Sequence, residues 1–177
     1  MKLINQIILI FIVLFSKIVF AQTIAVVNIQ SLIDNNFYYK EIIKDMEINQ
    51  EKYKENFELK EKELSYKLKD LEQSKLILNE IEINAQIDNY NKELTAFTIT
   101  VEEFNLHYQN QVINIREIIL KEIFILLEKY AIENQIDLIL DSESYLIASN
   151  SIDITDSIKE KLQNIDLKLE YINFEKN

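Results

Sequence analysis

From Phe37 to Asn134 the apolar residues recur every three, four or seven positions, which is the spacing of one face of a helix. The first apolar row repeats every seven residues, as in one half of a coiled-coil seam. Its members are Phe57, Leu64, Leu71 and Leu78. Charged residues four apart, such as Glu58 and Lys62, support a solvent-exposed outer face on the same helix.

A second apolar row follows at spacings of three and four. Its members are Leu94, Phe97, Val101, Phe104, Tyr108, Val112, Ile115 and either Ile118 or Ile119. The stretch between the rows, Ser74 to Asn84, has the weakest pattern. We therefore predict that the chain reverses near Glu80, because an antiparallel hairpin buries both rows and one straight helix buries neither. In that hairpin Phe57 faces Phe104 or Leu106, and Leu64 faces Ile99 or Val101.

Short β-forming segments flank this helical region. Thr23 to Ile29 (TIAVVNI), Asp137 to Asp141 (DLILD) and Ser144 to Asn150 (SYLIASN) are apolar and bounded by polar residues, which predicts three buried strands. Asp141 to Ser144 is predicted to be the turn between the last two.

Helix caps are predicted beside these strands. Ser31 and Asp34 are the candidates after the first strand, and Asp153 or Thr155 is the candidate for a last helix that runs to Leu162. The strands come from the two distant ends of the chain and must meet. So small a sheet buries little surface, which indicates that sister copies supply the missing burial.

The N-terminus predicts a secretory signal peptide. Lys2 precedes the apolar run of residues 7–15, which is too short to span a bilayer, and cleavage is predicted after Ala21. An uncleaved anchor is the alternative. Cleavage removes two of the 19 basic residues and leaves 17 against 30 acidic ones, a net charge of −13. Such a chain is not expected to bind nucleic acid through phosphate groups.

The composition excludes several kinds of chemistry. The chain has no glycine, proline or cysteine, so phosphate-binding loops, nucleophile elbows, disulfides and thiolate metal sites are all excluded. The single histidine, His107, cannot make a histidine-based zinc site alone. We predict that it packs at a surface, with pH sensing as the alternative. Adjacent acids such as Glu102 and Glu103 are predicted to be solvated. No enzymatic activity, cofactor or metal is expected.

The chain resembles the Skp (OmpH-like) family of periplasmic chaperones. The resemblance rests on four segments, of which the last two are the more specific. They are Ile24-Ala25-Val26-Val27-Asn28, Gln135-Ile136-Asp137-Leu138-Ile139-Leu140-Asp141, Tyr145-Leu146-Ile147-Ala148 and Asp153-Ile154-Thr155-Asp156.

The resemblance implies a mostly helical α+β protein and a homotrimer, in which strands from three chains form a small β-barrel body with long antiparallel coiled-coil arms. The division implied is 1–21 signal peptide, 22–36 with 113–163 body, 37–112 arm and 164–177 a tail of uncertain structure. The predicted trimerisation residues are Ile24, Val26, Val27, Ile29, Leu138, Ile139, Leu140, Leu146 and Ile147. The predicted arm-packing or client-contacting residues are Phe57, Leu64, Leu71, Leu94, Phe97, Val101, Phe104 and Tyr108.

The function that the resemblance implies is an ATP-independent holdase for unfolded outer-membrane proteins in the periplasm. Members of the family carry basic arms, whereas this chain is acidic, so no site for lipopolysaccharide or anionic lipid is carried over. The alternative is a periplasmic coiled-coil structural or adaptor protein without general chaperone activity.

Overall fold

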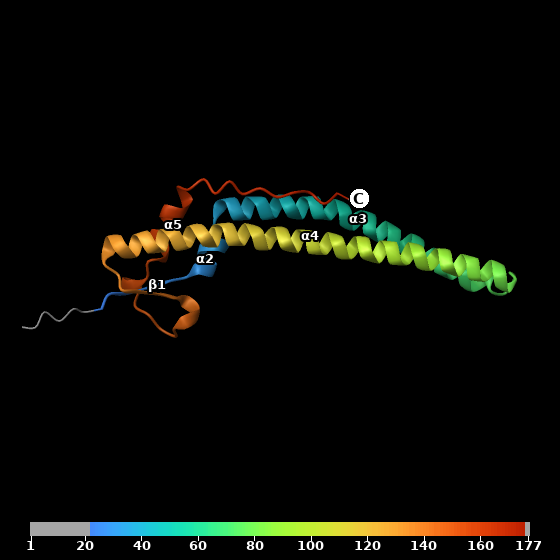
Figure 1. Ribbon diagram of the computed structural model, residues 1–177, viewed down its shortest axis with the longest axis horizontal. Helices are drawn as coiled ribbons and strands as arrows, with labels where there is room; N and C mark the ends of the chain where they lie inside the picture. The colour runs from blue at the N-terminus through green and yellow to red at the C-terminus, as the bar shows by residue number, and fades with distance from the viewer. Residues whose placement is uncertain (1–21, 176–177) are drawn as a thin grey trace, which may run out of the picture.

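The computed structural model describes residues 22–175. Two long helices, α3 (Phe37–Ser74) and α4 (Glu80–Asn134), run antiparallel as an extended arm, and the shorter elements gather at one end as a small body (Figure 1). With 38 and 55 residues, the two helices are about 57 and 82 Å long at 1.5 Å per residue. The predicted signal peptide lies outside the described residues.

The body joins the two distant ends of the chain. Strand β1 (Ile24–Val27) pairs in parallel with β2 (Leu138–Asp141), with Ile24 opposite Leu138 and Val27 opposite Asp141. Parallel strands need a long crossover, and here the whole arm is the crossover. The prediction that the β-forming ends of the chain meet is confirmed, and they meet within one chain. The described residues form a single two-stranded sheet.

The prediction of a third strand at Ser144 to Asn150 is wrong for the single chain. Residues Ser142–Ser144 form a 3₁₀ turn, irregular backbone follows, and a second 3₁₀ turn spans Asn150–Ile152. A strand needs a partner for its backbone groups, and the segment does not return to β2. Leu146 and Ile147 are instead 100% and 92% exposed.

The helix caps differ from the predicted ones because the first helix begins earlier. Helix α2 (Ile29–Asp34) already contains Ser31 and Asp34, so neither can cap it. Asn28 caps α2 by accepting the Ser31 N–H at 2.8 Å, and Asn36 caps α3 by accepting the Tyr39 N–H at 3.0 Å. Asparagine is as good an N-cap as serine or aspartate, so residue type alone could not show which residue caps each helix. The cap is set by the residue at which the helix begins.

The last helix, α5 (Thr155–Gln163), begins without a side-chain hydrogen bond from its cap residue, Ile154. Asp153 nevertheless accepts the Thr155 N–H at 2.9 Å, and the Thr155 hydroxyl accepts the Asn28 N–H at 2.9 Å. The second bond ties α5 to the first residues of the fold.

The arm reverses where the sequence pattern is weakest, as predicted. Asn79 caps α4 through a capping box, in which it accepts the Glu82 N–H and the Glu82 carboxylate accepts the Asn79 N–H. At the other end of α4, Gln135 takes the left-handed conformation, with φ of 54°. Glycine usually occupies that position. In a chain without glycine, Gln135 closes the helix.

One continuous core links body and arm. Ile115, Ile119 and Ile123 on α4 are fully buried, and α4 packs against α2 and α5. Ile119, and not Ile118, therefore continues the second apolar row. Toward the tip the core narrows to the half-buried seam between α3 and α4, in which Leu64 and Leu71 are buried.

Candidate functional site

The most exposed large apolar residues of the arm lie at its tip. Leu76, Ile77 and Ile81, which we call the tip patch, are 83–88% exposed. Helix α3 ends at Ser74 and α4 begins at Glu80, so the turn is too short to fold these side chains back onto the seam. Isolated exposed apolar residues are ordinary, but three that are close in sequence at the end of an arm are a candidate contact surface.

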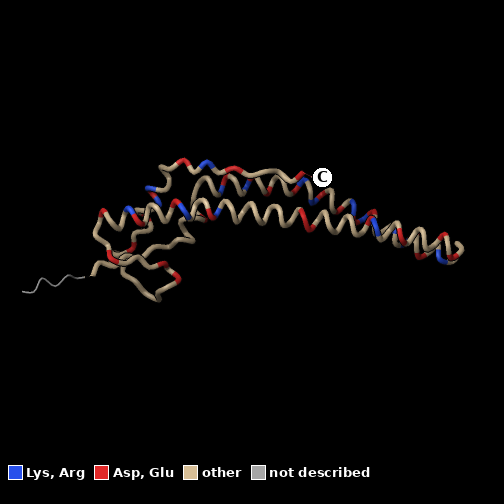
Figure 2. The backbone as a smooth tube through the Cα atoms, in the orientation of Figure 1, with Lys and Arg blue, Asp and Glu red and all other residues tan. Residues whose placement is uncertain are grey.

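Helix α4 presents a surface with little charge along the middle of the arm. Between Leu94 and Ile115, Glu102 and Glu103 are the only charged residues, and Figure 2 shows this stretch as mostly uncharged. Ile99 and Leu106 are about half exposed on it. In contrast, lysines are interspersed with Asp and Glu along α3 (Figure 2).

An aromatic cluster fills the seam nearer the body. Phe57 on α3 contacts Phe97 and Phe104 on α4, with ring centroids 6.0 and 5.1 Å apart. The predicted pairing of Phe57 with Phe104 is therefore confirmed. Tyr53 and Tyr108 extend the cluster toward the body, at 5.3 and 5.0 Å from Phe104.

Tyr108 combines apolar packing with polar contacts of its hydroxyl group. Burial raises the pKa of its hydroxyl, so the group stays protonated and donates a hydrogen bond to the side-chain oxygen of Asn49. This bond fixes the register of α3 against α4.

The residues after α5 form a tail along this seam. Phe174 inserts among Tyr53, Phe104 and His107, with ring centroids 5.4–5.7 Å apart. The tail (164–175), whose structure the sequence left uncertain, is thus part of the arm. Its apolar residues alternate with charged ones, a pattern in the sequence that could have predicted an extended segment.

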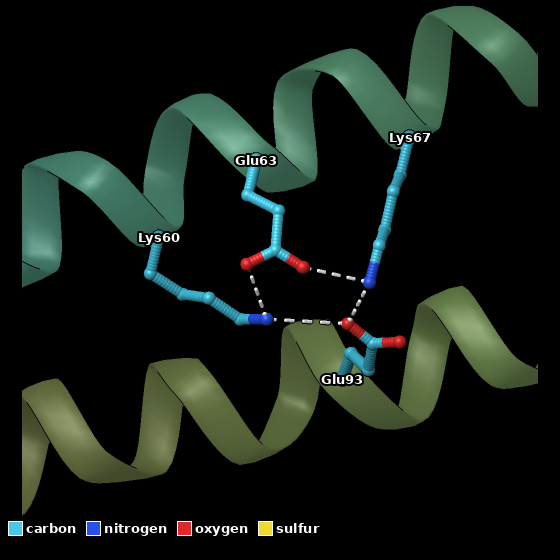
Figure 3. A network of polar contacts seen from close by, with 4 residues as sticks. All are labelled: Lys60, Glu63, Lys67 and Glu93. Atoms are coloured by element: carbon cyan, nitrogen blue, oxygen red, sulfur yellow. Dashed lines mark hydrogen bonds and ion pairs between the residues drawn. The ribbon is translucent and has the colours of Figure 1, made fainter.

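Toward the tip an ionic cluster replaces the aromatic one (Figure 3). Glu93 on α4 contacts Lys67 at 2.6 Å and Lys60 at 3.3 Å, and both lysines also contact Glu63 on α3. Hydrogen bonds from Lys67, then Lys60, lower the pKa of both carboxyl groups. Leu64 lies between the two lysines on α3, so it sits opposite the turn of Glu93 and not opposite Ile99 or Val101 as predicted.

Polar side chains fasten the two ends of the chain in the body. Asp137 accepts the Thr23 N–H at 2.8 Å and Asp141 accepts the Ile29 N–H at 3.2 Å. Arg116, the only arginine in the sequence, links α4 to Gln30 at 2.7 Å and to Asp34 at 3.2 Å. Several of the residues that carry the family resemblance are thus those that close the body.

The predicted body residues divide by exposure. Val26 and Val27 are buried, whereas Ile29, Ile139 and Leu140 are partly buried. Ile24, Leu138, Leu146 and Ile147 are exposed, as are Ile118, Phe124, Ile125 and Ile132 on the last turns of α4. No described residue pairs with the outer edge of β2.

The predicted arm residues divide in the same way. Leu64, Leu71, Phe104 and Tyr108 are buried in the seam, whereas Phe57, Phe97 and Val101 are partly buried and Leu94 is exposed. The tip patch was missed, because the sequence at residues 76–81 gives no sign of which apolar residues a short turn leaves outside.

Residues 22–175 contain no cluster of three or more histidine, cysteine or acidic side chains arranged to hold a metal ion. Within the same residues, no helix combines the length and apolarity needed to cross a bilayer. The polar clusters that are present, at Glu93 and Arg116, pair opposite charges between helices. Their arrangement joins structural elements.

The fold is that of an elongated α+β protein, with a helical-hairpin arm on a small two-stranded body. Residues 23–162 match the family of OmpH-like outer membrane proteins, and the chain belongs to that family. Among solved structures, the fold is similar to a proposed OmpH-like outer membrane chaperone from Caulobacter crescentus CB15. The TM-score is 0.64 at 12% identity, over 89% of this chain and 93% of that one.

No curated protein sequence matches the chain significantly. At the level of the family, the assignment supports a chaperone and not an enzyme. The family match ends at residue 162, before the tail.

Proposed function

We propose that the chain is an ATP-independent periplasmic holdase, which binds unfolded outer-membrane proteins and keeps them soluble until they insert. The observation that carries the proposal is the apolar surface left exposed on the arm, above all the tip patch. The family assignment and the signal peptide predicted up to Ala21 agree with it.

Binding would use many weak contacts along the arm. Leu94, Phe97 and Val101, together with the tip patch, would touch apolar segments of the client, while Leu64, Leu71 and Phe104 hold the hairpin. Contacts that are individually weak act together on one tethered chain. The high negative charge would keep the chaperone soluble while apolar surface is exposed.

The functional particle in this proposal is a homotrimer. The free edge of β2, the exposed side chains of Leu146 and Ile147, and the apolar residues on the last turns of α4 are surfaces that sister copies would cover. Segment 144–150 would gain in the assembly the strand partner that it lacks in one chain, and the strands of three copies would close a small barrel.

The chain offers a matched pair of variants that separates assembly from client binding. The dipeptide Leu-Ile occurs at Leu76-Ile77 in the tip and at Leu146-Ile147 in the body, and both copies are at least 84% exposed. We expect the double variant Leu146→Ser, Ile147→Ser to be a monomer in solution. We expect the double variant Leu76→Ser, Ile77→Ser to remain a trimer. Its affinity for clients should fall several-fold, since each lost contact removes part of a multivalent affinity.

The test uses residues 22–177, whose mass in solution is measured by light scattering, and a urea-diluted outer-membrane protein whose aggregation is followed without ATP. A trimer that suppresses aggregation supports the proposal. A chain that leaves aggregation unchanged contradicts it, and a trimer without such activity favours the structural or adaptor alternative.

A further inference from the structure

The tail lies beyond the region that matches the family, yet it is firmly packed. It runs beside the arm from the end of α5 to the middle of α3 (Figure 1). Leu167 and Phe174 are only 6% and 7% exposed. The tail forms no helix or strand in the described residues, so side-chain contacts hold it in place.

The exposure of the tail's side chains alternates as in a β-strand, although the backbone turns at Lys168, whose φ is 45°. Its odd-numbered residues from 165 to 171 pack against the core, and its even-numbered residues are charged and exposed. The inward residues are Ile165, Leu167, Leu169 and Tyr171, and the outward ones are Asp166, Lys168 and Glu170. After Tyr171 the pattern shifts by one residue, and Phe174 becomes the terminal anchor.

The arm holds the backbone of the tail through side chains. The Tyr53 hydroxyl donates to the Phe174 carbonyl, and the Phe174 N–H donates to the Tyr108 hydroxyl at 3.4 Å. The His107 Nε2 lies 2.7 Å from the Ile172 carbonyl oxygen. Contacts to the backbone do not depend on the identity of the bound residues. They suit any extended segment whose alternate side chains are apolar.

The seam also has unfilled space beyond the tail. A cavity of about 490 Å³ adjoins the Phe174 ring, and its lining combines apolar Phe57 and Phe97 with the charged pair Lys60 and Glu93. A segment that is longer than the tail, or bears larger side chains, would find room toward the tip.

We call the surface of the arm that holds the tail, around Tyr53, Phe104 and Tyr108, the tail groove. We propose that this groove binds extended client segments that have alternating apolar and polar residues and an aromatic end. Such segments would displace the chain's own tail. Strands of membrane β-barrels have this alternation, and girdles of aromatic residues flank their apolar band. The proposal rests on the holdase function and names the segments that it recognises. Clients compete with the tail, so the docked tail lowers their apparent affinity.

The chain has no tryptophan, so Phe174→Trp places a single reporter in the tail groove of the full mature chain. The probes are an unfolded, tryptophan-free outer-membrane β-barrel protein and a ten-residue peptide with the alternation of residues 165–174. We expect either probe to shift the emission to longer wavelength as the indole enters water. Ile172→Trp is the matched control, because Ile172 is 70% exposed, and its emission should not change.

A second measurement compares client affinity in the full chain. Phe174→Ala weakens the tail without altering the groove, so client should bind about three- to tenfold more tightly, whereas Ile172→Ala should leave the affinity unchanged. Unchanged emission of the Phe174→Trp variant with both probes, together with equal client affinity of the two alanine variants, overturns the tail groove even if aggregation is suppressed. Displacement by the peptide without any suppression of aggregation supports the groove and contradicts the holdase.

Discussion

The two halves of the arm belong to one hairpin but are held by different forces. In the half next to the body, Phe57, Phe104 and Tyr108 pack in an aromatic cluster that Phe174 of the tail covers. In the half next to the tip, the seam buries Leu64 and Leu71, and solvent-exposed ion pairs to Glu93 link the helices.

The difference indicates where the arm opens first. Burial of aromatic rings contributes several kcal/mol and is not screened by salt, whereas exposed ion pairs contribute little and are screened. The body half therefore sets the stability of the hairpin. The tip half opens at lower free energy, which would suit the client-binding surface proposed above.

The largest effect should come from Phe104→Ala, which empties the centre of the aromatic cluster. We expect a loss of about 3–5 kcal/mol in the free energy of unfolding, because a buried phenyl ring leaves a cavity. Urea denaturation followed by circular dichroism measures it. Phe37→Ala is the control, since Phe37 is exposed, and should cost little. Equal losses in the two variants would show that the aromatic cluster does not carry the stability of the body half.

Leu71→Ala should act locally in the tip half. We expect the tip to open about 2 kcal/mol more readily, because a buried side chain is lost where the seam is thinnest. Hydrogen exchange of amides near residues 64–90 should accelerate while the body half stays protected. Leu68→Ala serves as the control, because Leu68 is exposed on the same helix. Faster exchange across the whole arm would show that the halves do not open independently.

Arg116→Ala should loosen the contact between α4 and the first two helices, α2 and α3, where the arm joins the body. The guanidinium bonds Gln30, Asp34 and the Tyr39 hydroxyl, so its loss should cost about 1 kcal/mol of unfolding free energy at this partly exposed site. Arg116→Lys should recover only part of the loss, because an ammonium group cannot reach all three partners. Full recovery with lysine would reduce the role of Arg116 to charge alone.

The smallest effect should come from the ionic cluster. The pKa values of Glu63 and Glu93 lie below the usual 4.5, so their contribution is present above pH 4.5 and is lost as the pH falls further. Hydrogen exchange at the tip should therefore show reduced protection in acid and at high salt. Glu93→Gln should remove most of this dependence, and Glu103→Gln should not. A pH response that Glu93→Gln leaves intact would assign it to other groups.

The sequence predicted the parts of the fold that depend on periodicity. The seven-residue row at Phe57, Leu64 and Leu71 and the second row at Phe104 and Tyr108 were sufficient to place the hairpin and one of its cross-helix contacts. The register toward the tip was wrong at Leu64. The ion pairs of Glu93 with Lys60 and Lys67 continue the register of the aromatic cluster, and charges on two different helices have no common period from which it could be read.

What the sequence did not predict depends on partners that are distant in the chain. Leu146 and Ile147 are as apolar as β1, and only the presence of a neighbouring strand distinguishes a strand from a loop. The tail showed the period of a strand at Ile165 and Leu167, but nothing nearby indicated that α3 and α4 would hold it. The tip patch depends on how tightly residues 75–79 turn.

The parallel pairing of β1 with β2 has a consequence for the order of folding. Ile24 pairs with Leu138, more than a hundred residues further along the chain, so the sheet cannot close until the whole arm lies between its two strands. The hairpin needs only contacts between neighbouring helices and should form early, whereas the body closes late. A chain interrupted before residue 138 would thus hold a finished arm on an open base, and the last quarter of the polypeptide determines when the protein is complete.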